Sequence, residues 1–486
     1  MLTLYSCKRG PDSEVTRAKV RVTFNGAPDR DRPNLPDCSA RIASTPNIRT
    51  FAALTPDDPN DHVIKKGDLP NAYVWADNDR VEYVELPADI HPRDANGDLA
   101  VARVDGALYG KLNAGTLFEK KRDKFLTEEC GLTQCKLDPS FFYNLETGFR
   151  LAIVVDDLFW RSRRAASDSF ESTITATFGD CKIHELDDHW TDYVGALIRR
   201  VGNCIEWSSS RAVKEALVKN DLTHIASTDI PAAPHSYVSK ASRAEPDYAD
   251  ASRTSSFLRR QGCLQWIVTT GRFDVGVAVK QLATVMASPK PEHVGLQSKV
   301  FGYLQRTKDM ALTWNPARSL EQPNILYYYS DGSYTGEGLQ SRMGFVGVMN
   351  GGAVIAENAC PKFQCTGVFD VEEAASCWAA KDIVYRKAFL TELGYPQPQT
   401  KLYCDNAATV LFSEKVTITA LNKHILVRGA YTRDCQAKGH LVLVHVPGVD
   451  NVSDQQTKNL PTGTFYGYLP DYGFICIPYP NGYSGK

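Results

Sequence analysis

Two apolar runs flank a pair of aspartates in the sequence FRLAIVVDDLFW, residues 149–160. The letters before it, SFFYN and then LETG, predict a strand and a turn that lead into this segment. Aspartate pairs also occur at 57–58 and 187–188, so a pair alone has little specificity. The apolar context of Asp156 and Asp157 predicts a tight hairpin tip between two buried strands. Paired carboxylates there are costly unless a cation neutralises them, and a divalent metal is the natural solution.

Such a metal site needs a third carboxylate from elsewhere in the chain. The segment GDLPNAYVWA (67–76) offers Asp68 at the start of an apolar, strand-like run. Asp68 could equally cap a strand or a turn, and the residues alone leave both interpretations open. Two metal ions held this way would suit the transfer of a nucleotide to a 3′-hydroxyl, since both would stabilise charge on the phosphate.

From Asn324 onward the pattern becomes rich in strands. Three successive antiparallel strands are predicted by NILYYYSDGS, GFVGVMNGG and AVIAENA. A helix is expected from about Val371 to Leu393, and the strands KLYCDN and LVLVHVP follow with helical stretches after each. This β-β-β-α-β-α-β-α order is that of an RNase H-like fold.

A second set of carboxylates lies at the ends of these elements. Asp331 and Asp405 end two strands, Glu373 opens the helix, and Asp454 follows the last strand in VDNVSDQQTK. Four carboxylates on separate elements can hold two Mg²⁺ ions about 4 Å apart, as phosphodiester hydrolysis by two metals requires. Each residue alone could be a solvated acid, and Glu373 could simply complement the start of its helix.

Length and composition fit a globular protein of several domains. The chain has 486 residues, 43% hydrophobic and 23% charged, which is enough for roughly three domains. The net charge of −2 neither supports nor excludes nucleic-acid binding, because basic residues can be concentrated in one groove. Residues 227–256, rich in Pro, Ala, Ser and Asp, predict a linker or long loop, and residues 257–310 are expected to be helical.

The cysteines and the first residues bear on the compartment. Thirteen cysteines occur without a repeated framework, and the start MLTLYSCKRG has no apolar leader. We therefore expect reduced thiols in a cytosolic or nuclear setting, and no secretion. No run of about 18 apolar residues exists, so no membrane span is expected.

Residues 1–320 resemble the reverse transcriptase of copia-type (Pseudoviridae-like) LTR retrotransposon Pol polyproteins. The motifs stand in the order of that family: VTRAKVRVTFNG, NIRTFAAL, GDLPNAYVWA, VDGALYGKLNAG, VVDDL, FLRRQGCLQWIVTTGRFDVGVAV and VFGYLQRTKDMAL. The remainder resembles the RNase H of the same polyproteins, through YSDGS, YCDN, NKHILVRGAYTRD and VPGVDNVSDQQTKNLP. Because the start falls inside the family's fingers region, the chain looks like a piece of a polyprotein.

The resemblance implies a fold and a division of the chain. It implies an α+β and α/β multidomain protein, with a right-hand polymerase of fingers, palm and thumb followed by an RNase H-like domain with a five-stranded mixed sheet. The expected regions are 1–225 for fingers and palm, 226–320 for a thumb- or connection-like part, and 321–486 for the RNase H-like domain. The implied activity is RNA-directed DNA polymerase (reverse transcriptase) with RNase H.

The resemblance also implies roles for particular residues. Asp68, Asp156 and Asp157 would bind Mg²⁺, and Tyr73 would be a steric gate that selects deoxynucleotides, although a core aromatic is an equal alternative. Lys19 and Arg21 would hold the incoming triphosphate, with exposed strand charges as the alternative.

In the second set, the family's spacing from Gly352 to Gly394 fits without a gap and assigns its glutamate to Glu373 rather than to Glu372. Two Mg²⁺ ions would occupy each site, and Mn²⁺ could replace them. The implied partners are an RNA template, a DNA primer, an RNA–DNA hybrid and dNTPs, with no membrane. The implied location is cytoplasmic, in a virus-like particle, and can include a nuclear phase.

Several positions depart from the family pattern. Before the aspartate pair, Val154 occupies the position where the family has Tyr or Phe. Lys111-Leu112 replaces the family's Leu-Lys, and Gly115 and Phe273 each replace a proline of the family. The alternative to an active enzyme is therefore a decayed or domesticated copy that binds nucleic acid without catalysis. Because all seven predicted ligands persist while their neighbours have changed, we favour activity.

Overall fold

A computed structural model describes residues 2–9, 15–23, 40–56, 60–85, 93, 96–97, 101–238, 250–335, 341–415 and 426–481. The chain forms two compact units. The first comprises Met1–Ser44 with Asp58–Leu186, and the second comprises Thr45–Asp57 with Asp187–Lys486. This division does not coincide with the three expected regions 1–225, 226–320 and 321–486, whose assignment stays a prediction.

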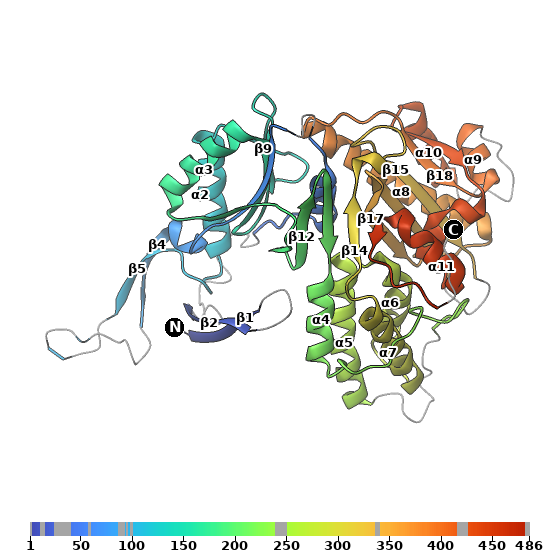
Figure 1. Ribbon diagram of the computed structural model, residues 1–486, viewed down its shortest axis with the longest axis horizontal. Coiled ribbons are helices and arrows are strands. Elements are labelled where there is room, and N and C mark those ends of the chain that lie inside the picture. The colour runs from blue at the N-terminus through green and yellow to red at the C-terminus, as the bar shows by residue number, and fades with distance from the viewer. Residues whose placement is uncertain are drawn as a thin grey trace. The chain divides into compact units, whose positions relative to one another are not determined.

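The first unit is built on an antiparallel six-stranded sheet. Its order is β10 (Lys182–Glu185), β3 (His62–Asp68), β9 (Asp157–Arg163), β8 (Phe149–Val154), β7 (Phe141–Asn144) and β6 (Thr133–Gln134). The predicted strand, turn and strand around LETG are confirmed as β7 and β8. Two helices, α2 (Ala114–Glu128) and α3 (Arg164–Phe178), cover one face of this sheet (Figure 1).

Alternation along the two central strands makes that face. Leu151 and Ile153 of β8 pair with Trp160 and Leu158 of β9, so these four side chains point to one side of the sheet. They belong to one buried core with the aromatic rings of α2 and α3, namely Phe118, Phe125, Phe170 and Phe178. Each such buried side chain contributes roughly 1.5–3 kcal/mol relative to an exposed one, which holds the hairpin rigidly.

Two small two-stranded sheets complete the described part of the first unit. One pairs β1 (Leu2–Arg9) with β2 (Val15–Thr23), and the other pairs β4 (Asp77–Val84) with β5 (Ala102–Gly106). The alternating residues of AKVRVTF (18–24) and RVEYVEL (80–86) are typical of strands, and their described residues lie in β2 and β4. The prediction of a strand at NAYVWA is wrong, because these residues form a 3₁₀ helix, η2 (Ala72–Trp75). Asn71 turns the chain with a φ of 52°, and the Trp75 indole closes the turn on the carbonyl of Pro70.

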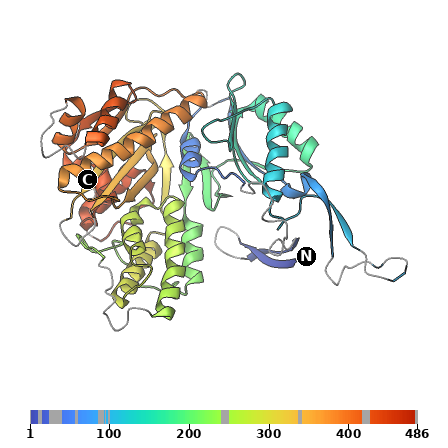
Figure 2. The same ribbon diagram turned by 180° about the vertical axis from the view of Figure 1, so that it is seen from behind.

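The second unit begins with a sheet and a group of helices. The antiparallel five-stranded sheet has the order β11 (Thr191–Tyr193), β12 (Ala196–Val201), β13 (Cys204–Ser208), β14 (Ala311–Trp314) and β20 (Phe474–Ile475). The helices α4 (Ser210–Lys219), α5 (Ala251–Thr269), α6 (Gly276–Ala283) and α7 (Pro291–Arg306) lie side by side in both views (Figures 1 and 2). The helical prediction for 257–310 is confirmed, but α5 starts at Ala251, inside the predicted linker 227–256.

The predicted five-stranded mixed sheet is confirmed in the second unit. Its order is β17 (Gly352–Ala359), β16 (Arg342–Met349), β15 (Tyr327–Ser333), β18 (Thr400–Cys404) and β19 (Leu441–His445). The first three strands are antiparallel, and the β15–β18 and β18–β19 pairs are parallel. The long helix α8 (Val368–Glu392) lies across one face of this sheet (Figure 2), starting three residues earlier than predicted. The shorter helices α9 (Ala407–Glu414), α10 (Leu426–Ala437) and α11 (Thr462–Tyr468) follow.

A buried arginine joins α8 to residues 45–57, the N-terminal segment of the second unit. Arg386 is 2% exposed, and its guanidinium forms an ion pair with Asp382 one turn earlier and hydrogen-bonds the Tyr328 hydroxyl. It also donates to Asn47 and Thr50 of α1 (Thr45–Ala53). The charge is therefore fully paired inside the core, which fixes α8 against β15 and α1. No helix in the described parts of the chain is long and apolar enough to cross a membrane.

Candidate metal centre

Three aspartates meet at one end of the mixed sheet. Asp331, Asp405 and Asp454 each offer a carboxylate oxygen, and the three oxygens lie within 4.8 Å of one another. The parallel pairing of β15 with β18 sets Ser330 beside Cys404, so the next residues, Asp331 and Asp405, are neighbours. Asp405 follows the end of β18 as predicted, but Asp331 does not end its strand, because β15 continues to Ser333 and Asp331 pairs with Gly344 of β16. Asp454 comes from the short helix η7 (Val452–Gln456). The structure thus brings together the three aspartates that the strand order predicted.

The glutamate beside these aspartates is Glu372, not the predicted Glu373. Glu372 accepts a hydrogen bond from the backbone N–H of Gly332 at 3.1 Å, next to Asp331. It also lies with Cys404 and Asp405 in a second group whose ligand atoms are within 4.8 Å of one another. The two groups share Asp405, so four carboxylates surround one end of the sheet.

Helix geometry explains this choice. On α8, Ser376, Ala379 and Ile383 are fully buried against the sheet, and Ser330 of β15 shares a hydrogen bond with Ser376. Glu372 lies one turn before Ser376 and on the same face, since residues four apart are neighbours on a helix. Glu373 is rotated by about 100° from that face. The apolar stripe of the helix therefore indicated Glu372, whereas the family spacing assigned Glu373.

A glycine permits the contact. A side-chain carbon added to Gly332 would lie 2.5 Å from the backbone nitrogen of Glu372. Because no real side-chain carbon tolerates that distance, only glycine allows the start of α8 to approach β15 so closely. Gly332, in the motif YSDGS, is a site residue that sequence reasoning missed, although its place directly after Asp331 was the available signal.

Glu373 points instead toward α10. Burial raises the pKa of its carboxyl to about 7, and the positive charges of Arg433 and Arg428 oppose that rise. Both arginines belong to α10, so Glu373 is a buried acid that faces basic residues of a neighbouring helix. The geometry assigns it a structural place rather than a place among the aspartates.

Polar neighbours hold the aspartates in position. Asn451 donates to Asp405 at 3.1 Å and to the carbonyl of Ser330 at 3.0 Å, so it joins the loop before η7 to both strands. The Thr457 hydroxyl donates to Asp331. The Lys458 ammonium lies 2.8 Å from an oxygen of Asp454 and 3.5 Å from one of Asp331.

The electrostatics of this centre favour an added cation. Asp331 is 1% exposed, and burial together with the neighbouring carboxylates raises its pKa to about 7, while Lys458 opposes that shift. Burial and the charges of Asp331 and Asp405 raise the pKa of Glu372 to about 10. Although burial opposes it, the carboxylates of Asp331 and Asp454 raise the pKa of Lys458 above its usual range. One ammonium does not balance four carboxylates, and a divalent cation with oxygen ligands fits the remaining charge.

Cys404 is a poor candidate for a metal ligand in this group. Burial and the nearby Glu372 raise the pKa of its thiol well above the usual range, so the sulfur stays protonated. Metal ions bind thiolate rather than thiol, and Mg²⁺ prefers oxygen. The carboxylates are therefore the candidate ligands of this centre.

The other predicted carboxylates lie on the hairpin of the first unit. Asp156 occupies the turn between β8 and β9, Asp157 opens β9, and Asp68 is the cross-strand partner of Asp157 at the end of β3. The predicted hairpin tip is confirmed, but Asp68 ends a strand rather than starting one. The backbone N–H of Leu69 donates to the carbonyl of Asp156 at 3.1 Å, which ties the two strands at this point.

These three residues are neighbours along the backbone, but their carboxylates are less closely gathered than those of the second unit. Among the described residues, they do not form a set of three whose ligand oxygens all lie within 4.8 Å of one another. All three side chains are half-buried. Their role as metal ligands stays a prediction.

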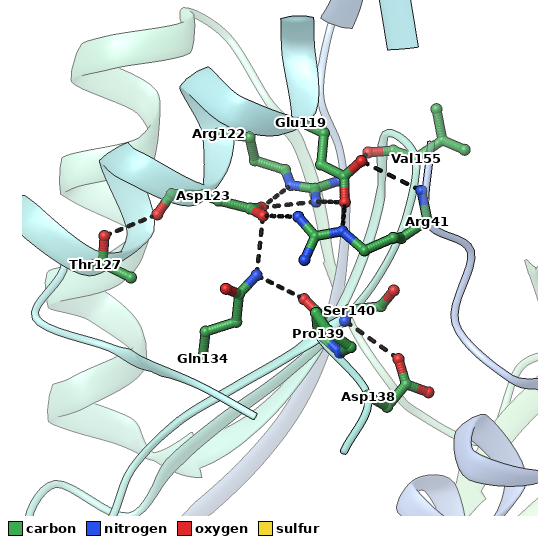
Figure 3. A network of polar contacts seen from close by, with 10 residues as sticks. All are labelled: Arg41, Glu119, Arg122, Asp123, Thr127, Gln134, Asp138, Pro139, Ser140 and Val155. Atoms are coloured by element: carbon green, nitrogen blue, oxygen red, sulfur yellow. Dashed lines mark hydrogen bonds and ion pairs between the residues drawn. The ribbon is translucent and has the colours of Figure 1, made fainter. Parts of the chain in front are cut away.

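The turn itself has an unusual backbone. Val155 has a φ of 60°, a conformation that a β-branched residue rarely adopts, and its carbonyl accepts a hydrogen bond from Arg122 at 3.2 Å. Figure 3 shows how Arg122 is held: its guanidinium binds Asp123, which also binds Arg41, and Arg41 forms an ion pair with Glu119. Arg122 is 5% exposed, so the turn is fixed by a hydrogen bond from a buried guanidinium that is itself held by this network.

Of the three predicted substrate-binding residues, the structure describes the side chain of Tyr73 alone. Tyr73 lies on η2, where its ring packs against Tyr109 at 4.7 Å between centroids and against Phe118 at 6.1 Å. Lys19 and Arg21 lie two apart on β2, and their side chains fall outside the described residues. The roles of all three stay predictions.

Sequence comparisons find relatives over almost the whole chain, although no protein-family model matches it. It is 21% identical over 479 residues to the "Retrovirus-related Pol polyprotein from transposon TNT 1-94" of Nicotiana tabacum, covering 95% of this chain and 34% of that protein. It is 22% identical over 483 residues to the corresponding polyprotein from transposon RE1 of Arabidopsis thaliana, covering 98% and 32%. The chain spans about a third of the length of these relatives. The predicted resemblance to retrotransposon Pol polyproteins is confirmed.

Solved structures give weaker similarities. The foamy viral protease-reverse transcriptase in complex with dsDNA is 14% identical and covers 92% of this chain and 78% of its own, with a TM-score of 0.44. LC11-RNase H1 in complex with an RNA/DNA hybrid is 19% identical and covers 27% and 93%, with a TM-score of 0.22. TM-scores this low support no argument about the present chain, so the fold rests on its own strand order.

Proposed function

We propose that this chain, similar over nearly its whole length to retrotransposon Pol polyproteins, is a reverse transcriptase–RNase H region of the copia type. The observation that carries the proposal is the meeting of Asp331, Glu372, Asp405 and Asp454 at one end of a five-stranded mixed sheet. The motif order of the first 320 residues supports the polymerase part.

In the RNase H-like part, the four carboxylates would hold two Mg²⁺ ions, with Mn²⁺ as a substitute. Bound there, the ions would activate a water and stabilise the charge that develops on the phosphate of the RNA strand. Asn451 and Thr457 keep the ligands oriented through their hydrogen bonds. Lys458 offsets part of the negative charge before a cation binds and stays protonated there.

In the polymerase part, Asp68, Asp156 and Asp157 would hold the metals for nucleotide addition to a primer. The buried hairpin fixes where the two aspartates of the turn stand, and the pairing of Asp68 with Asp157 supports a shared site. We further propose Tyr73 as the gate against a 2′-hydroxyl. It lies on η2, five residues after Asp68, and its ring is held by the rings of Tyr109 and Phe118. Lys19 and Arg21 would bind the triphosphate of the incoming dNTP.

The partners follow from this chemistry. They would be an RNA template, a DNA primer, the RNA–DNA hybrid that copying produces, and dNTPs. A virus-like particle in the cytoplasm, with a nuclear phase, would be the setting.

Two assays on purified protein test the proposal. The first follows extension of a DNA primer on an RNA template with dNTPs and Mg²⁺, and the second follows cleavage of a labelled RNA–DNA hybrid. We expect Asp156→Asn to remove extension and spare cleavage, and Asp405→Asn to do the reverse. Asp188→Asn is the matched control, because Asp188 belongs to an exposed aspartate pair, and it should change neither activity.

The outcomes separate the proposal from its alternative. Loss of both activities in either single variant would contradict two independent sites. If the wild-type protein binds the hybrid but neither extends nor cleaves with Mg²⁺ or Mn²⁺, the chain is a binding protein derived from a retroelement. If it does not bind nucleic acid at all, both functions are refuted.

A further inference from the structure

A cavity of about 540 Å³ lies in the second unit next to the carboxylates, and neither proposed activity uses it. Its volume is in the range of pockets that bind small organic ligands, roughly 300–1,000 Å³. The walls come from β15, from the segment before it, from the loop between β19 and η7, and from η8 (Leu469–Tyr472). Residues far apart in sequence therefore build one concave site.

Tyrosine rings form one wall. Tyr328, Ser330 and Gly332 of β15 face α8, so Tyr327 and Tyr329 face the opposite side of the strand, on which the cavity lies. Half-buried rings on a rigid sheet are good stacking surfaces for a planar ligand.

The strand next to β15 supports this wall. Tyr403 of β18 stacks on Tyr329 with 5.0 Å between ring centroids and an interplanar angle of 27°. Tyr327 meets the ring of Tyr329 edge-on at 6.0 Å. The orientation of the two cavity-lining rings is therefore fixed before a ligand arrives.

The opposite rim is polar and includes one cation. Arg318 lines the cavity and is exposed, and its guanidinium donates to none of the residues that the structure describes. A side-chain carbon at Gly351, whose φ is 70°, would lie 2.4 Å from the Cβ of Arg318, so glycine is required to seat the arginine there. Asp450 and Asp471 add carboxylates on the rim, which accept hydrogen bonds from ribose hydroxyls or base amino groups and repel a phosphate placed beside them. The rings and Arg318 therefore match a base whose phosphate lies on the side of Arg318.

The cavity is joined to the candidate metal centre in two ways. Tyr329 precedes Asp331 by two residues on the same face of β15, which is about 7 Å along the strand, or roughly two stacked nucleotides. Val449, Asp450 and Val452 line the cavity, while Asn451 between them binds Asp405. The cavity and the carboxylates therefore lie on adjoining parts of the same strand and the same loop.

We propose that this cavity is a nucleotide-binding subsite, in which a nucleobase stacks on Tyr327 and Tyr329 and Arg318 binds its phosphate. The base would come from a free nucleotide or from an unpaired position in a strand bound at the carboxylates, and the second source rests on the proposed function. Stacking tolerates any base, because each has a π face, so the subsite would have little sequence preference.

The test measures binding without cleavage, in EDTA, on the full chain. Adenosine monophosphate is followed by ligand-observed NMR, and a labelled 12-nucleotide single strand by fluorescence anisotropy. Val449→Trp should fill the cavity from an exposed position (70% exposed) without changing the core. Tyr327→Ala and Arg318→Gln remove the stacking surface and the cation. Tyr237→Ala is the control, since Tyr237 is exposed and lies outside the cavity.

We expect Val449→Trp to abolish the signal of adenosine monophosphate and Tyr327→Ala to weaken binding of the strand by about 5- to 150-fold. Loss of mononucleotide binding identifies a free nucleotide as an occupant, and an effect on the strand alone identifies an unpaired base. Unchanged binding of both probes in all three cavity variants, or no binding of either probe to the wild-type chain, overturns the subsite. Hybrid cleavage measured separately, with Asp405→Asn as the reference, shows whether the proposed function fails as well.

Discussion

Replacement of Glu372 by Gln, beside the matched replacement of Glu373 by Gln, distinguishes the residue that the structure places at the metal centre from the one predicted by family spacing. The pKa of Glu372 is raised to about 10, so at pH 7.5 and without metal its carboxyl is protonated and neutral. An amide has nearly the same shape and no charge. We therefore expect Glu372→Gln to change the stability of the metal-free protein by less than about 1 kcal/mol.

With Mg²⁺ the two variants should differ. Saturation at about 100 times Kd stabilises a protein by about 2.7 kcal/mol. The second unit comprises residues 45–57 and 187–486, and an unfolding entropy of about 2.1 cal/mol/K per residue converts that energy to a rise in Tm of about 4 °C. Glu372→Gln should lose this rise, while Glu373→Gln should keep it, because Glu373 faces Arg433 of α10 instead.

The assay is thermal unfolding by calorimetry, with EDTA and with Mg²⁺, together with cleavage of an RNA–DNA hybrid. Removal of a metal ligand should lower cleavage by at least about 100-fold, since changing residues that only hydrogen-bond the ligands already costs about 10–100-fold in metal affinity. Glu373→Gln should cleave nearly as wild type does. A Mg²⁺-dependent rise in Tm that survives in Glu372→Gln and disappears in Glu373→Gln would refute the placement of Glu372 at the metal centre.

Four further predictions concern single groups. Arg386→Met should destabilise the second unit by about 1–3 kcal/mol in chemical denaturation, because it leaves the buried acceptors on Asn47 and Thr50 without their donor and removes the ion pair with Asp382. Gly332→Ala should destabilise the same unit by about 1–3 kcal/mol and reduce hybrid cleavage, since the new carbon meets the backbone of α8 at 2.5 Å. Arg122→Met should lower kcat for primer extension more than it raises KM for dNTP, because the arginine holds the carbonyl of Val155. Burial raises the folded-state pKa of Asp331 to about 7, above its ordinary value of about 3.8, so its contribution to stability is complete below pH 4 and is lost as pH rises through 7, by on the order of 4 kcal/mol in EDTA.

Three of these predictions have a comparison variant. Lys438→Met removes an exposed i,i+4 ion pair and should cost under about 1 kcal/mol, so an equal loss for Arg386→Met would contradict the role of the buried pair. Lys124→Met, on the same helix as Arg122 but exposed, should leave extension unchanged. Asp331→Asn should reduce the slope of the stability profile between pH 4 and pH 8, with a remainder from Glu372 and Glu373, whose pKa values are also raised. A slope equal to that of the wild-type protein would assign the titration to other groups.

Much of the fold could be predicted from local patterns. The hairpin around Asp156 and the five strands from Tyr327 to His445 have alternating or continuous apolar runs bounded by turn residues, and such runs report burial directly. The run NAYVWA misled for a physical reason. Its apolar residues suit a strand, but Pro70 and the left-handed Asn71 turn the chain, and the residues pack as a 3₁₀ helix.

The candidate site was predicted in part. Neighbouring parallel strands whose apolar runs lead into Asp331 and Asp405 bring these residues together, so sequence order was sufficient for them, although β15 continues to Ser333. The glutamate was not fixed in this way, because adjacent residues of a helix differ by about 100° in direction. The ungapped family spacing assigned Glu373, and an error of one residue in that spacing is enough to put the wrong glutamate at the site. The residues of α8 that are buried against the sheet lie on the face of Glu372 instead.

The sequence by itself determined the elements and the identity of most carboxylates, because both depend on residue types and spacings within short segments. Only the tertiary structure decided which glutamate faces the aspartates, that Gly332 permits the approach of α8, and that Arg122 supports the strained turn at Val155. It also decided the cavity beside Tyr329, whose walls come from segments far apart in the sequence. These features depend on distances between elements, and such distances are set by the packing of the whole unit rather than by any one stretch of the chain.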